Sequence, residues 1–202
     1  IRYVPLSREQ RRLYDGAEQR LREDLNVQKR QNASRANRRG HIPDAEKSAV
    51  EVLAELTRLR QIALDPSLVF ENYKGGAEKL GAIMELVDEA MEVGRKVLIF
   101  SQFTSYLDVV AAELDRRGIA HFAITGATPK RERVRLVNAF NDDETPVFLV
   151  SLKAGGTGLN LTGASVVVHA DPWWNAAATD QATDRAHRIG QNREVDVYKV
   201  VA

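Results

Sequence analysis

Three polar side chains near the end of the chain have the types and spacing to act together on a phosphate group. Gln181, Arg185 and Arg188 stand four and three positions apart in DQATDRAHRIGQN, residues 180–192. In a helix, a turn of about 100° per residue would place all three on one narrow stripe. Arginine suits a phosphate because its planar guanidinium stays charged and donates two parallel hydrogen bonds to the oxygens. The alternative is a solvated helix in which Asp184 and Arg188 form an ordinary surface ion pair.

A glycine-rich loop comes one predicted strand earlier. The stretch SLKAGGTGLNLTG, residues 151–163, places Gly155, Gly156 and Gly158 after an apolar run, with Lys153 beside them. Glycines let backbone amides approach an oxyanion closely, and the lysine adds a mobile positive charge. The stretch has neither a GK[ST] ending nor the GxGxxG pattern, so it predicts neither a triphosphate-binding loop nor a dinucleotide site. A tight turn from strand to helix is the alternative.

Three further loops carry polar groups directly after apolar runs. They are SQFT, residues 101–104, ADPWWN, residues 170–175, and TGATPKRER, residues 125–133. The last of them begins a predicted helix that carries Lys130, Arg131, Arg133 and Arg135 on its first turn and beyond. A helix N-terminus with basic side chains suits a phosphate. A merely solvated basic face fits the same residues equally well.

Alternating helices and short apolar strands must position these loops. The patterns predict helices at 77–94, 104–118 and 128–140, and strands at 96–101, 121–125, 146–151, 165–170 and 195–201. Thr104 or Ser105 is the predicted N-cap of the second helix and Thr128 that of the third. Continuous runs of Val, Ile, Leu and Phe between helices indicate a parallel sheet covered on both faces. The sequence therefore predicts a three-layer α/β domain, whose loops leave the carboxyl ends of the strands on the edge where ligands bind.

The first part of the chain predicts a helical hairpin. A polar helix should begin at a capping box, Ser7–Gln10, and a second should run over residues 46–63. Between them, residues 26–44 have no apolar period and predict a loop that is basic through Lys29, Arg30, Arg35, Arg38 and Arg39. This loop is either solvated and mobile or a nucleic-acid contact. We therefore predict a helical extension over residues 1–75 and the α/β domain over residues 76–202.

Composition excludes several classes of protein. The 202 residues are 44% hydrophobic, and 29 basic residues nearly balance 28 acidic ones, so net charge identifies no partner. There is no cysteine, and the four histidines lack metal-ligand spacing, so we expect no metal site within the chain. No apolar run approaches about 18 residues and there is no signal peptide, which predicts a cytosolic protein without a membrane partner. A first residue other than Met suggests a piece of something larger.

Several contiguous segments of the sequence resemble the motifs of one protein family. SLKAGGTGLNLTGASVVVHADPWWN followed by DQATDRAHRIGQ resembles motifs V and VI of Swi/Snf-type, superfamily-two helicase-like ATPases. VLIFSQFTSYLD is similar to the motif IV region, and TGATPKRERVRLVNAFN to the segment that links motifs IV and V. LRQIALDPSLV resembles the helical stretch before the lobe, although it lacks the Cys or His usual there.

This resemblance implies the second RecA-like lobe of a two-lobe motor that translocates on double-stranded DNA and remodels protein–DNA complexes. ATP would bind in the cleft between lobes, with its phosphates and Mg²⁺ held by the N-terminal RecA-like lobe. Arg185 and Arg188 would be arginine fingers, and Gln181 would orient them or the attacking water. Three residues of motif V would lie near the nucleotide: Gly156, Gly158 and Asn160.

The resemblance also implies a set of contacts to the DNA backbone. These residues are Ser101, Gln102, Thr125, Gly126, Arg131, Arg133, Ser151 and Lys153. The chain contains no Walker A lysine and no DExH acid, so by itself it should hold half an active site and hydrolyse no ATP. The resemblance implies a protein of the bacterial nucleoid or of the nucleus.

Two other functions compete with this interpretation. A helicase-like module could dock DNA or a partner protein without hydrolysis, which the intact Arg185 and Arg188 argue against. An unrelated Rossmann-type enzyme for small molecules is disfavoured because the GxGxxG pattern is missing.

Overall fold

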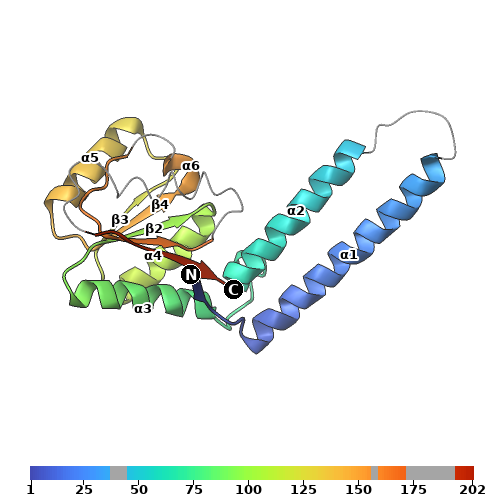
Figure 1. The fold of residues 1–202 in the computed structure, drawn as a ribbon, viewed down its shortest axis with the longest axis horizontal. Coiled ribbons are helices and arrows are strands. Elements are labelled where there is room, and N and C mark those ends of the chain that lie inside the picture. Colours follow the sequence, from blue (N-terminus) through green and yellow to red (C-terminus); the bar gives the residue numbers. More distant parts are fainter. Residues whose placement is uncertain (37–44, 156–158, 172–193) are drawn as a thin grey trace. The chain divides into compact units, whose positions relative to one another are not determined.

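The chain folds into two units. The computed structural model describes residues 1–36, 45–155, 159–171 and 194–202 (Figure 1). One unit, the α/β lobe, combines Ile1–Pro5 with Glu78–Ala202, and the other, the helical hairpin, comprises Leu6–Ala77.

A parallel sheet forms the middle of the α/β lobe. Within the described residues it has six strands in the order β1-β6-β5-β2-β4-β3, and every neighbouring pair is parallel. The strands are β1 (Arg2–Tyr3), β2 (Val97–Ser101), β3 (His121–Ile124), β4 (Val147–Ser151), β5 (Val166–His169) and β6 (Asp196–Val201). All residues of β2, β4 and β5 are buried, as expected of strands covered on both faces. The predicted parallel sheet is confirmed.

The first strand is an addition to the predicted sheet. The sequence alone predicts residues 1–5 to lie with the helices, but β1 pairs in parallel with β6, with Arg2 opposite Val200. The backbone N–H of Val4 extends the pairing by donating to the carbonyl of Val201 at 2.8 Å. Strand pairing between the two ends of a chain leaves no local signal, because the partner lies almost 200 residues away.

Helices cover both faces of the sheet. They are α3 (Glu78–Glu92), α4 (Thr104–Arg116), α5 (Lys130–Asp142) and the short α6 (Leu152–Gly155). The chain passes from β2 beyond β4 to β3 and then returns to β4, so right-handed crossovers place α4 and α5 on opposite faces. In Figure 1, α3 and α4 lie on one side of the sheet and α5 and α6 on the other. This is the predicted three-layer, RecA-like α/β arrangement, and it is confirmed.

The core between the sheet and α5 contains the aromatic side chains. Phe100 of β2 and Phe148 of β4 pack with Phe140 of α5 in one apolar cluster. The rings of Phe140 and Phe148 meet edge to face, with centroids 5.0 Å apart. This packing fixes α5 against the sheet and with it the loops at both ends of the helix.

The predicted N-caps of α4 and α5 are wrong. The structure places Phe103 and Pro129 at the cap positions, and neither gives a side-chain cap hydrogen bond. Thr104 already lies in the first turn of α4, and Thr128 Oγ1 accepts from the backbone N–H of Thr125 at 3.0 Å. The Thr128 hydroxyl thus closes the preceding loop, which shapes the edge where the strands end.

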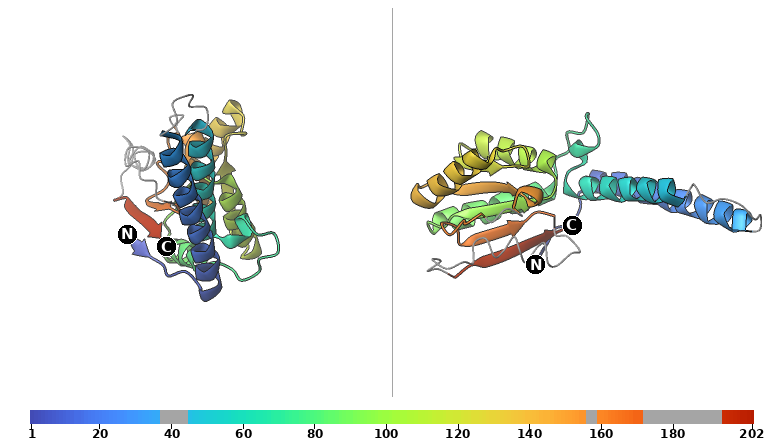
Figure 2. Two further views of the ribbon diagram at one scale, coloured as in Figure 1. Left: turned by 90° about the vertical axis from the view of Figure 1, so that its right-hand side faces the viewer. Right: turned by 90° about the horizontal axis from the view of Figure 1, so that it is seen from above.

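The helical hairpin consists of α1 (Arg8–Ala36), α2 (Ala45–Leu64) and the 3-10 turn η1 (Pro66–Leu68). Its core contains Ala17 and Leu21 of α1 and Leu59 and Ile62 of α2, so the two long helices lie side by side (Figure 2). Gln10 joins them through Nε2, which donates to the carbonyl of Ile62 at 2.9 Å at the end of α2.

Residues 26–36 are helical, which contradicts the predicted loop. Gln, Lys, Arg and Ala are good helix formers, and the sequence has no glycine or proline between Gly16 and Gly40. The helix therefore continues although its sequence lacks an apolar period. The remainder of the predicted basic loop, with Arg38 and Arg39, lies outside the described residues. No helix in the described ranges is long and apolar enough to cross a bilayer.

Candidate functional site

The carboxyl ends of four strands meet at one edge of the sheet. Ser101 at the end of β2 stands opposite Ser151 at the end of β4. Ile124, the last residue of β3, is opposite Val150, and His169, the last residue of β5, is opposite Phe100. Because the strands are parallel and in this register, the loops that follow them leave from the same edge. The structure therefore brings together three of the predicted loops.

The loop after β2 is held by short-range and long-range hydrogen bonds. Ser101 Oγ accepts from the backbone N–H of Phe103 at 3.0 Å, and the N–H of Gln102 donates to both carboxylate oxygens of Asp171, at 3.2 and 3.1 Å. The Gln102 side chain is half-buried, and its amide nitrogen is buried without a hydrogen-bond partner among the described residues. Gln102 is thus the residue of this loop whose side-chain donor is unused.

The loop after β3 closes on itself. The backbone N–H of Ala127 donates to Thr125 Oγ1 at 3.3 Å, and that of Thr128 to the carbonyl of Thr125 at 3.2 Å. Arg133 reaches back from α5 and donates to the carbonyls of Thr128 at 2.7 Å, Gly126 at 3.1 Å and Thr125 at 3.3 Å. The guanidinium of Arg133 therefore holds the loop in shape, while Gly126 at its tip is exposed.

The other basic side chains of α5 divide into two kinds. Arg135 forms an ion pair with Glu132 at 2.6 Å, and this hydrogen bond lowers the pKa of the Glu132 carboxyl. Lys130 and Arg131 are exposed on the first turn, and no ion pair among the described residues involves either of them. A free first turn with two cations is the part of α5 that is available to an anion.

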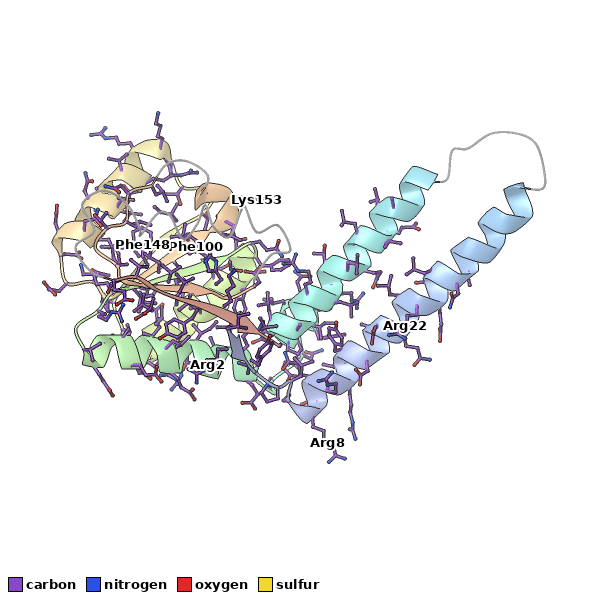
Figure 3. The ribbon with its side chains drawn as sticks, in the orientation of Figure 1. Arg2, Arg8, Arg22, Phe100, Phe148 and Lys153 are labelled. Atoms are coloured by element: carbon purple, nitrogen blue, oxygen red, sulfur yellow. The ribbon has the colours of Figure 1, made fainter. Side chains whose placement is uncertain are left out.

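The loop after β4 begins as the short helix α6. Ser151 Oγ accepts from the backbone N–H of Ala154 at 3.2 Å, and Lys153 is exposed on this turn (Figure 3). Farther along, Asn160 is exposed and its carbonyl accepts from Asn141 Nδ2 at 2.9 Å. Asn141 Oδ1 in turn accepts from the N–H of Gly163 at 2.9 Å, so one side chain of α5 ties down the end of the loop.

Two predicted DNA contacts are not at the surface. Ser101 is 0% exposed and Ser151 is 1% exposed, and both hydroxyls already accept backbone N–H groups. Their side chains shape the loops from inside. Among the predicted DNA contacts, the exposed residues are Lys153, Arg131 and Gly126, and Gln102 is half-buried.

Gln181, Arg185 and Arg188, as well as Gly156 and Gly158, lie outside the described residues. In the part of the chain that is described, no cluster of three or more His, Asp or Glu side chains could hold a metal ion.

Four residues of this edge were not among the predicted site residues, although Asn141, Gly163 and Asp171 lie in segments that the sequence marks. Lys79, Asn141, Gly163 and Asp171 make their contacts with segments between 19 and 91 positions away. A Cβ on Gly163 would approach Asn141 Cα to 3.1 Å, which explains the glycine there. Lys79 is only 5% exposed and Asp171 only 7%, so both carry buried charges.

Comparison with known proteins shows the family of this chain. Residues 78–190 match the family model described as the helicase conserved C-terminal domain. Over 204 residues the chain is 38% identical to the "uncharacterized ATP-dependent helicase MG018" of Mycoplasma genitalium, covering 99% of this chain and 18% of that protein. Over 125 residues it is 41% identical to helicase swr1 of Schizosaccharomyces pombe, covering 61% of this chain and 10% of that protein.

A solved structure extends the likeness to the fold. The Sulfolobus solfataricus SWI2/SNF2 ATPase core in complex with double-stranded DNA superimposes with a TM-score of 0.77 at 28% identity, over 98% of this chain and 39% of that one. The chain thus spans less than a fifth of the two curated relatives and less than half of this solved core.

Proposed function

The chain belongs to the helicase conserved C-terminal domain family and is a Swi/Snf-type C-terminal lobe, and from this premise we propose that it serves a two-lobe ATPase that translocates on double-stranded DNA. The domain boundary we propose lies near residue 76, which the division into two units supports, with residues 1–5 added to the lobe. The proposed target of the movement is a protein complex bound to the DNA.

The ATPase part of the proposal concerns the whole protein. The relative MG018 is named an ATP-dependent helicase, and the chain covers 18% of it. No Walker A lysine occurs in the sequence, so ATP phosphates and Mg²⁺ would be held by an N-terminal RecA-like lobe. In this proposal Arg185 and Arg188 reach the transferred phosphate and Gln181 orients them or the attacking water, while Gly156, Gly158 and Asn160 line the nucleotide side of the lobe.

One observation supports the DNA part of the proposal above all. Parallel register brings the loops after β2, β3 and β4 to one edge, where Lys153 and Arg131 are exposed. Cations from different loops along one edge suit successive phosphates of a DNA backbone, which give affinity without sequence preference. Gln102, Thr125 and Gly126 complete the proposed contact surface. Ser101, Ser151 and Arg133 hold the loops that present it.

The arginine fingers test the proposal in the protein that carries both lobes. Arg185→Ala and Arg188→Ala should each lower DNA-stimulated ATP hydrolysis by about 10³-fold or more, since fingers are typically worth 10³ to 10⁵ in rate. DNA and ATP affinities should be largely retained. Lysine at either position should rescue poorly, because an ammonium cannot form the bidentate fork.

A surface ion pair provides the matched control. Arg22 pairs with Glu18 on α1 at 2.7 Å, so Arg22→Ala should leave hydrolysis normal. Normal hydrolysis in both finger variants would show that Arg185 and Arg188 are solvated surface residues without a role in hydrolysis. If the unsubstituted protein binds DNA but hydrolyses no ATP, the non-hydrolysing binding module is the correct function instead.

A further inference from the structure

Two buried charges of opposite sign lie at the carboxyl edge of the sheet. Lys79 on α3 is 5% exposed and Asp171, after β5, is 7% exposed. Taking a charge out of water is costly unless hydrogen bonds and nearby charges compensate for it. An apolar pair of similar volume would be the cheaper way to fill this space, so two buried charges here indicate a role other than packing.

Each charge holds a different piece of backbone. The Lys79 ammonium donates to the carbonyl of Ala170 at 3.3 Å, and the carboxylate of the next residue, Asp171, accepts from the N–H of Gln102 with both oxygens, at 3.2 and 3.1 Å. The N–H of Ala170 donates to the carbonyl of Phe100 at 3.0 Å. Three segments therefore meet within a few residues: the first turn of α3, the loop after β2 and the chain that leaves β5.

These contacts begin where strand pairing stops. The β2–β5 ladder ends with Phe100 opposite His169, and beyond it no strand register fixes the two chains. The position of Gln102 relative to residues 170–171 thus depends on the Asp171 carboxylate, and the carbonyl of Ala170 is held by Lys79. Loss of the Asp171 carboxylate would remove the hydrogen bonds that hold Gln102, and loss of the Lys79 ammonium would remove the donor to the carbonyl of Ala170, so either change would loosen this junction.

The two chains joined here have different tasks in the proposed function. Gln102 belongs to the loop that would contact DNA. Asp171 directly precedes residues 172–193, the stretch of sequence that contains Gln181, Arg185 and Arg188. We propose that Lys79 and Asp171 are positioning residues that couple the DNA-contacting loop after β2 to the chain that carries the arginine fingers. This inference rests on the proposed function, and neither residue would touch DNA or ATP, because both are buried.

Steady-state hydrolysis by the protein with both lobes tests the coupling. Lys79→Met and Asp171→Asn should lower kcat at saturating DNA by about tenfold or more, since misplacement of a site by about 1 Å can cost 10²-fold. The KM for ATP should change by less than about twofold, because phosphate binding stays with the other lobe. Lys79→Arg should restore most of kcat, because a guanidinium also donates to the carbonyl of Ala170.

An arginine at the opposite edge of the same sheet is the matched control. Arg95 donates to Ser165 Oγ at 2.9 Å and forms an ion pair with Asp196, both at the amino ends of their strands. Arg95→Met should lower the Tm of the lobe but leave kcat of the folded protein normal. This control separates loss of coupling from loss of stability.

The outcomes separate this inference from the proposed function. Normal kcat in Lys79→Met and Asp171→Asn, with Arg185→Ala inactive, would overturn the coupling alone. Normal hydrolysis in Arg185→Ala would overturn the proposed function first. If Lys79→Met fails to fold, the kcat of Asp171→Asn tests the coupling, because this substitution keeps the size of the side chain. If Asp171→Asn also loses its fold, or if kcat falls no further than in Arg95→Met, the pair serves stability only and the coupling is wrong.

Discussion

Two neighbouring arginines of α5 should affect DNA binding in different ways. Arg131 is exposed, whereas Arg133 donates three hydrogen bonds to the carbonyls of Thr125, Gly126 and Thr128. Replacing Arg131 by alanine removes one cation that can neutralise a phosphate. Replacing Arg133 by alanine leaves the surface charge of the first turn in place but removes the side chain that holds the loop.

The expected sizes of the two effects follow from these contacts. Each phosphate contact contributes about −0.9 to the slope of log affinity against log salt, so Arg131→Ala should make the slope shallower by roughly one. Arg133→Ala should leave the slope unchanged and lower affinity at every salt concentration. Loss of three charged hydrogen bonds at a half-buried site should cost about 2 kcal/mol of stability, which lowers Tm by about 4–8 °C in a domain of this size.

Fluorescence anisotropy with a double-stranded oligonucleotide, at salt concentrations from about 50 to 200 mM, measures the slope, and thermal unfolding measures the Tm. Arg135→Ala is the matched control, because Arg135 is paired with Glu132 on the same helix. This substitution should change the salt slope little and should lower the Tm by less than Arg133→Ala does. An equal loss of slope in Arg131→Ala and Arg133→Ala would refute the division of roles. An unchanged slope in Arg131→Ala would show that Arg131 does not contact a DNA phosphate.

Three further predictions concern the loop after β4, acid stability and the isolated chain. Gly163→Ala should destabilise the lobe by about 1–2 kcal/mol, because its Cβ would crowd Asn141 Cα at 3.1 Å, and a normal Tm would contradict this. Hydrogen bonds from Arg116 and Arg117 lower the pKa of Glu113 from 4.5 to about 2. This stabilises the fold above about pH 4.5 and is lost as pH falls toward 2, so Glu113→Gln should flatten that part of the stability–pH curve, and an unaltered curve would exclude the effect. The isolated chain should hydrolyse no ATP with or without DNA, because it lacks a Walker A lysine, and robust turnover would refute the two-lobe mechanism.

Much of the α/β lobe was predictable from the sequence because its signals are local. Continuous apolar runs such as VLIF in β2 and VFLV in β4 are typical of strands covered on both faces. Amphipathic stretches between them predict the covering helices, and parallel pairing then sends the polar loops to a single edge. The motif strings that resemble the family are contiguous, so they too could be recognised without a structure.

The limits of the helices were less predictable. The absence of an apolar period suggested a loop after residue 25, but α1 continues to Ala36 because intrinsic propensity is enough where no glycine or proline intervenes. The hydroxyl of Thr128 could have capped α5 or closed the loop before it. Competition between such local hydrogen bonds depends on where the rest of the chain packs.

The roles of individual polar residues at the edge were decided by tertiary structure alone. Sequence alone shows Arg131 and Arg133 as two cations two positions apart, yet their directions on α5 make one a surface charge and the other a loop brace. Lys79 and Asp171 lie 92 positions apart, and only the fold places their hydrogen bonds on adjoining pieces of backbone. Type and spacing determine what chemistry a side chain can do, whereas direction and burial, which depend on packing between distant segments, determine whether it does so.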